Sequence, residues 1–92
     1  MSQVPIATGR AHVAARLLDL SLGGALLALG SSLEVGAVHE FALDLGARTL
    51  KVQGQVRHCR PADRYTGYHV GVSFIAIDPH DQEALGEYLG GH

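Results

Sequence analysis

Glycine spacing is the feature of this sequence that most constrains its fold. The 92 residues contain 12 glycines, which repeatedly interrupt apolar stretches that are each about the length of a β-strand. Short apolar runs broken at this spacing are typical of a β-meander or a small barrel. Residues 11–20 and 25–29 are so uniformly aliphatic that a helix is a real alternative there. Strands are favoured because Gly23 and Gly24 separate the two runs, and each glycine costs a helix interior about 1 kcal/mol relative to alanine.

Alternation of apolar and polar side chains predicts three more strands. It is visible over residues 38–45, is clearest over residues 48–59, and returns over residues 68–74. Residues 60–67 contain proline, aspartate and glycine, and they are predicted to form an exposed connection.

One helix is predicted after the last strand. Asp78 offers a side-chain acceptor to the first helical amides, and Pro79 suits the first helical position. Four apolar residues recur at three- and four-residue spacing and form a stripe that can lie against the sheet: Ala84, Leu85, Tyr88 and Leu89. Gly90 and Gly91 are expected to end this helix.

Composition excludes several classes of protein. The chain is 47% hydrophobic and 17% charged with a formal net charge of -2, and it has no run of Lys or Arg, so duplex DNA or RNA is not an expected partner. No apolar run approaches the roughly 18 to 20 residues that span a bilayer, so membrane insertion is not expected. Residues 1–10 lack a signal-peptide pattern, and the single Cys59 cannot form an internal disulfide. A cytoplasmic location follows as the expectation.

No catalytic or metal site is predicted. The six histidines and Cys59 show none of the spacings typical of zinc ligands. His58 and Cys59 are a base beside a thiol, but adjacent strand residues point to opposite faces and are badly placed for proton transfer. We therefore expect a protein that is not an enzyme and has no cofactor.

Asp19, Ser21 and Gly24 form the pattern D-x-S-x-x-G at the end of an apolar run. A carboxylate can accept two hydrogen bonds from the N1 and N2 donors of a guanine, and a hydroxyl beside glycine can approach further polar groups. A turn that only reverses the chain is the alternative interpretation of the same residues.

The order of segments from Arg10 to Leu89 resembles the PilZ domain family. Asp19-Leu-Ser-Leu-Gly-Gly24 is similar to its D-x-S-x-x-G motif, and four later segments resemble its following turn, central strand, late G-V-x-F strand and final helix: Leu33-Glu-Val-Gly36, Leu50 to Val56, Tyr68 to Phe74, and Ile77 to Leu89. The resemblance implies an all-β fold, a six-stranded antiparallel PilZ-like β-barrel with a short C-terminal α-helix. We expect the domain at residues 11–92, preceded by a flexible N-terminal segment at residues 1–10.

The resemblance also implies a ligand, the bacterial second messenger cyclic di-GMP. Family members bind it through the D-x-S-x-x-G loop and an upstream R-x-x-x-R element, which is missing here: only Arg10 and Arg16 precede Asp19, with five residues between them rather than three. Arg10 is the candidate substitute for a phosphate contact, although an ordinary solvated arginine at a strand start is the favoured interpretation. Arg16 is interpreted as a strand residue that forms a salt bridge or lies at an exposed edge. Because charge-assisted hydrogen bonds contribute about 1.5 to 3 kcal/mol each, losing two would weaken binding by two or more orders of magnitude.

Two functional hypotheses follow. The first is a regulatory module that binds cyclic di-GMP through Asp19, Ser21, Gly24 and Arg10, which would act as a switch. The second is a degenerate PilZ-fold adaptor that binds a protein of motility or pilus machinery and no nucleotide. Either would engage a protein partner, and homo-oligomers remain open. Arg57, Arg60 and Arg64 flank a loop that could meet an anion or an acidic partner, with a solvated loop as the alternative.

Overall fold

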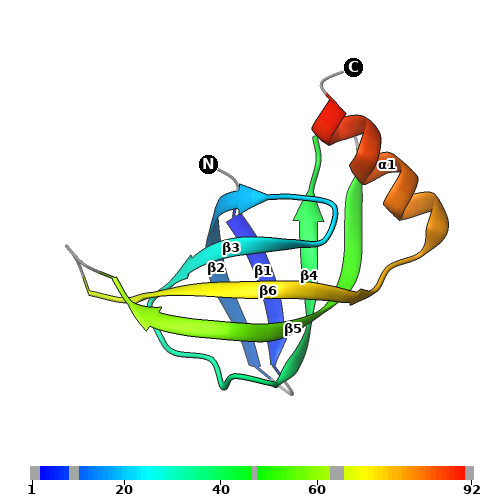
Figure 1. Cartoon of the computed structure of the whole chain (residues 1–92). Helices are drawn as coiled ribbons and strands as arrows, with labels where there is room; N and C mark the ends of the chain where they lie inside the picture. The colour runs from blue at the N-terminus through cyan, green and yellow to red at the C-terminus, as the bar shows by residue number, and fades with distance from the viewer. Residues whose placement is uncertain (1–2, 9–10, 47, 63–65, 91–92) are drawn as a thin grey trace.

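The protein is an all-β domain that ends in one helix, as Figure 1 shows for the computed structural model, which describes residues 3–8, 11–46, 48–62 and 66–90. The described residues form six strands and one helix in this order: β1 (Gln3–Thr8), β2 (Ala11–Leu20), β3 (Gly24–Leu29), β4 (Val38–Asp44), β5 (Thr49–Pro61), β6 (Tyr68–Ala76) and α1 (Pro79–Gly90). The expected all-β class and the C-terminal helix are confirmed.

All neighbouring strands are antiparallel, and their pairing runs in the closed order β1-β2-β3-β6-β5-β4. The β1–β4 seam that closes this circuit has only two residue pairs, Ile6 with Phe41 and Ala7 with Glu40. By contrast, β3 pairs with β6 over six residues, from Gly24 with Ser73 to Leu29 with Tyr68. The β3–β6 pairing is therefore the main junction between the first three strands and the last three.

The boundary expected between residues 10 and 11 differs from the structure. Gln3–Thr8 is strand β1, which pairs with β2 along its whole length and with β4 at the seam. Ile6 is fully buried in the core. Pro5 obscures this strand in the sequence, because sheets normally restrict proline to edges and strand starts.

The inner faces of the strands supply one apolar core. Alternation in β4 and β5 predicted these faces correctly, since Phe41 and Leu43 are buried while Glu40 and Asp44 are exposed. The core consists of Ile6, Ala15, Leu27, Leu29, Phe41, Leu43, Leu50, Val52, Val56, Val70, Val72 and Leu85. The ring of Phe41 lies where a side chain at Gly54 would be, so this glycine makes room for the largest core residue.

Strand β5 is longer than the sequence predicted. It continues through Arg60 and Pro61, which were assigned to the connection, because both residues pair with β6 opposite His69 and Tyr68. A proline at the last position of a strand is compatible with the missing amide donor. The consequence is that Arg60 lies on a strand, where His69 of β6 is its neighbour across the sheet.

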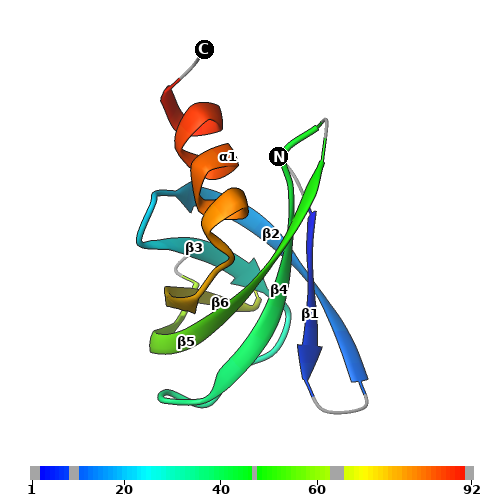
Figure 2. The same cartoon turned by 90° about the vertical axis from the view of Figure 1, so that its right-hand side faces the viewer.

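Helix α1 lies at the end of the barrel that carries the β2–β3 and β4–β5 turns, as Figures 1 and 2 show. Asp78 caps the helix as expected: its Oδ1 accepts a hydrogen bond from the amide of His80 at 2.8 Å. Arg48 Nη2 and Asp81 Oδ1 form an ion pair at 2.6 Å that joins the β4–β5 turn to the first helical turn. In the described residues no helix is long and apolar enough to span a membrane.

The predicted helical stripe is only partly buried. Leu85 has no exposed surface and Ala84 packs against the core, whereas Tyr88 and Leu89 are 50% and 38% exposed. The helix continues for about one turn beyond Leu85, and its residues 87–90 are exposed. Leu85 is therefore the main apolar anchor of the helix.

We expect Leu85→Ala to lower the free energy of unfolding by about 2 to 4 kcal/mol, because it removes a fully buried side chain and leaves a cavity. Leu89→Ala is the matched control in the same helix and should cost less than about 1 kcal/mol, since its side chain is already partly in water. Urea denaturation followed by circular dichroism measures both. Equal losses would contradict the assigned anchoring role of Leu85.

Candidate functional site

A β-bulge near the end of β2 places Asp19 on the outer face of the barrel. The β2–β3 register shifts between Leu17 and Asp19, so that Leu17 and Leu20 both pack against the core while Asp19 is exposed. A bulge inserts an extra residue and re-aims the side chains that follow it. Without the bulge, strict alternation would put Leu17 and Leu20, which are three positions apart, on opposite faces of the sheet.

Ser21 stabilises the turn between β2 and β3. Its backbone amide donates a hydrogen bond to the carbonyl oxygen of Gly24 at 2.9 Å, and its hydroxyl lies 3.3 Å from the same oxygen. The turn interpretation of the motif is therefore correct for Ser21. The hydroxyl oxygen still has lone pairs with which it can accept a hydrogen bond from a ligand.

Gly24 allows β3 to approach β6 closely. A Cβ at this position would overlap the carbonyl oxygen of Val72, a backbone atom that cannot move aside easily. The neighbouring carbonyl of Gly23 accepts a hydrogen bond from the amide of Phe74 at 2.9 Å, which holds the turn against β6. Gly24 is thus required by the sheet and shapes the site through the backbone.

Asp19 carries the chemistry that the site can offer. Its Oδ1 accepts a hydrogen bond from the amide of Leu20 at 2.9 Å, and Oδ2 accepts none from the described part of the chain. The carboxylate is solvent-exposed, so Oδ2 and the second lone pair of Oδ1 can accept hydrogen bonds from a bound molecule.

A hollow of about 300 Å³ lies beside this carboxylate. Its lining includes Asp19, Ser21 and Gly24 together with Leu26 of β3 and Ser73 of β6. This volume is at the small end of the roughly 300 to 1,000 Å³ that small-molecule sites occupy, so it fits part of a dinucleotide, such as one base. Ser73 could not be assigned from the sequence, because the β3–β6 register brings it opposite Gly24.

The structure bears differently on the predictions for the four candidate site residues. Asp19, Ser21 and Gly24 line one hollow, and their role in binding a ligand stays a prediction. Arg10 lies outside the described residues, so its role as a phosphate contact stays a prediction. Arg16 is exposed on β2, on the same outer face as Asp19.

His58 and Cys59 diverge, as expected for neighbours on a strand. The ring of His58 covers Gly71 on the outer face, where it occupies the space that a side chain would need, whereas Cys59 packs against the core. Among the described residues no group of three or more His, Cys, Asp or Glu side chains is arranged to hold a metal ion.

Comparison with known proteins defines the class. The family model for the PilZ domain matches residues 1–91, and the chain belongs to this family. The solved structure of the Bacillus subtilis inhibitor of motility (MotI/DgrA) is similar to this fold with a TM-score of 0.77 and 20% sequence identity. That similarity covers 94% of this chain and 44% of the B. subtilis chain, so this chain spans less than half of that protein. No curated protein sequence matches.

We expect Gly24→Ala to destabilise the domain by about 1 to 3 kcal/mol, because the added methyl group must push β3 away from β6. Gly23→Ala is the adjacent control: its Cβ would meet nothing within 4 Å, so its effect should stay within about 0.5 kcal/mol. Thermal or urea unfolding of the two variants distinguishes them. A Gly24→Ala protein as stable as Gly23→Ala would contradict the close approach at Val72.

Proposed function

We propose that this PilZ domain is a non-enzymatic signalling module that binds cyclic di-GMP at the hollow beside Asp19. The observation that carries the proposal is the exposed Asp19 carboxylate, whose Oδ2 accepts no hydrogen bond from the described residues. One carboxylate can take both the N1–H and the N2–H donors of a guanine edge. Membership of the PilZ family supports this ligand.

The other motif residues would act mainly by holding this carboxylate in place. Ser21 fixes the turn through Gly24, and Gly24 holds β3 against β6 beneath the proposed base. A rigid turn lowers the entropy cost of ordering the site when the ligand binds. Arg10, which lies between β1 and β2 in the sequence, remains the predicted phosphate contact.

Weak affinity is expected for residues 1–92 tested by themselves. Each charge-assisted hydrogen bond contributes about 1.5 to 3 kcal/mol, and no R-x-x-x-R pair that would supply two of them precedes Asp19 in these residues. Binding would shift the domain between two surface states rather than drive a reaction. The cytoplasmic location expected from the sequence also stays a prediction.

Titration calorimetry with cyclic di-GMP tests the proposal. We expect the native chain to bind, and Asp19→Ala to weaken binding at least tenfold because the guanine donors lose their acceptor. Glu34→Ala is the control, since it removes another exposed carboxylate away from the hollow. If the native chain gives no binding heat up to millimolar nucleotide, the proposal is wrong. Equal affinities of the Asp19→Ala and Glu34→Ala variants would also contradict it.

The protein adaptor remains the second candidate, and exposed apolar side chains around α1 favour it. Leu22 at the tip of the β2–β3 turn is 52% exposed, and its Cδ2 lies 3.9 Å from where a Cβ of Gly86 would be. Leu89, one turn further along the helix, and Tyr88 are also exposed. The similar B. subtilis protein is named an inhibitor of motility, which supports looking for a partner in motility machinery.

Different substitutions should disrupt the adaptor and the nucleotide module. For an adaptor, Leu22→Ser and Leu89→Ser should abolish binding of a purified motility partner, while Asp19→Ala leaves it unchanged with or without cyclic di-GMP. If Asp19→Ala abolishes partner binding only when nucleotide is present, the adaptor hypothesis is wrong and a ligand-gated module is supported.

A further inference from the structure

The register of four neighbouring strands assembles a row of basic side chains on the outer face of the barrel. Arg16 of β2 pairs with Ala28 of β3, Ala28 pairs with His69 of β6, and His69 pairs with Arg60 of β5. Residues that pair across a sheet lie on the same face. Their neighbours along each strand point into the core, so this row points outward: Ala15, Leu17, Leu27, Leu29, Tyr68, Val70 and Cys59.

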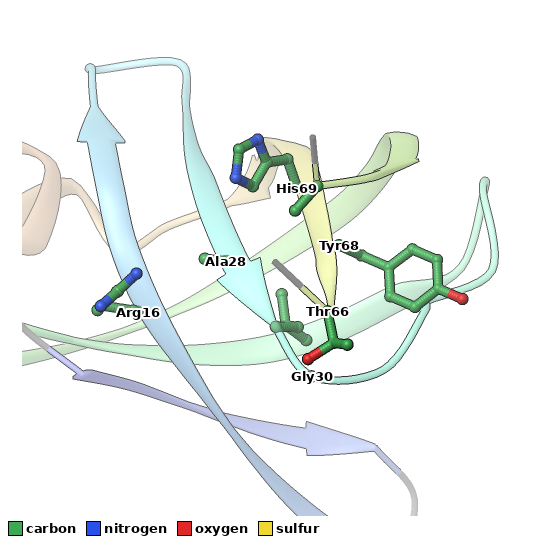
Figure 3. A pocket seen from close by; sticks show the side chains of 8 residues that line it. Arg16, Ala28, Gly30, Thr66, Tyr68 and His69 are labelled. Carbon is green, nitrogen blue, oxygen red and sulfur yellow. The ribbon is translucent and has the colours of Figure 1, made fainter. Parts of the chain in front are cut away.

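A hollow of about 190 Å³ lies along this row and is lined by Arg16, Ala28, His69 and Thr66. Figure 3 shows Arg16 and His69 on either side of Ala28. Adjacent strands are about 4.8 Å apart, so the backbones of Arg16 and His69 are separated by about 10 Å with only a methyl group between them. An arginine side chain is long enough to reach over that methyl group toward a shared ligand.

Positively charged residues predominate on these four strands. Strands β2, β3, β5 and β6 contain a single carboxylate, Asp19, but four cationic residues: Arg16, Lys51, Arg57 and Arg60. The other described carboxylates lie on the β3–β4 connection, on β4, and on or just before α1. Neither Arg16 nor Arg60 forms an ion pair with a described residue. In a chain of formal net charge -2, these two guanidinium groups are left available to an anion.

The row is next to the hollow beside Asp19. Leu26 lines that hollow and Ala28 lines this one; the two residues are on β3, two positions apart and on the same face. Two residues along a strand span about 7 Å, which places the basic row within one nucleotide of the proposed guanine position. A molecule seated on both hollows would present a base to Asp19 and an anionic group to Arg16.

We propose that Arg16, with Arg60 and His69 beside it, forms a phosphate-binding row on the outer face of the barrel. This inference rests on the proposed function, because the phosphates are those of the nucleotide whose base Asp19 holds. Arginine is suited to this task because its planar guanidinium makes paired hydrogen bonds to phosphate oxygens. The row lies on rigid strands, so its geometry exists before the ligand arrives.

The test compares two cyclic dinucleotides and two classes of variant by titration calorimetry. Arg16→Gln and Arg60→Gln should each weaken cyclic di-GMP binding about tenfold and reduce its dependence on salt. Lys51→Gln is the control because it removes an exposed positive charge from β5, at a position paired with β4. Cyclic di-AMP has the same phosphates but no guanine edge, so any binding of it should fall with Arg16→Gln and not with Asp19→Ala.

The outcomes separate this inference from the proposed function. If the native chain binds cyclic di-GMP and Arg16→Gln and Arg60→Gln behave like Lys51→Gln, the phosphate row is wrong while the guanine site stands. If the native chain binds no nucleotide, the proposed function fails, and inorganic pyrophosphate followed by NMR then tests the row alone. Pyrophosphate should shift the side-chain resonances of Arg16 and Arg60 in the native chain, and the Arg60 shift should be lost in Arg16→Gln. Absence of both shifts in the native chain would overturn the row. Unfolding curves identify any variant that fails to fold.

Discussion

The pairing of β3 with β6 is the interaction on which the rest of the structure depends. It joins the first three strands to the last three over six residue pairs, whereas the β1–β4 seam, the other strand junction between these halves among the described residues, has two. The pairing needs Gly24, because any Cβ there would overlap the backbone of β6. These contacts join residues about 40 to 50 positions apart, so forming them costs chain entropy that the buried core must offset.

The same pairing builds both hollows of the outer face. At one end it brings Ser73 beside Gly24 and the Asp19 turn, and further along it places His69 beside Ala28, across from Arg16. A carboxylate and a basic row are therefore held on one rigid surface at a spacing suited to a nucleotide. Rigid strands limit how far these groups can adjust, which favours one ligand shape over others.

The helix adds a second type of surface at the barrel end. Leu85 anchors α1 in the core, while Leu22 of the turn that follows Asp19 and Leu89 of the helix remain exposed. The proposed nucleotide site and this apolar surface thus share one short turn. A ligand that reorders the turn would change the apolar surface as well, which is the physical requirement for a switch.

The sequence by itself determined the features that depend on neighbours along the chain. Alternation predicted the inner faces of β4 and β5, Asp78 and Pro79 predicted the helix start, and the D-x-S-x-x-G pattern located the turn. Only the tertiary structure decided which strands pair and in what register. It made β1 part of the barrel, added a bulge before Asp19, and left Tyr88 exposed. It also aligned Arg16 with His69 and Arg60, because a register between distant strands is set by the shared core rather than by local sequence.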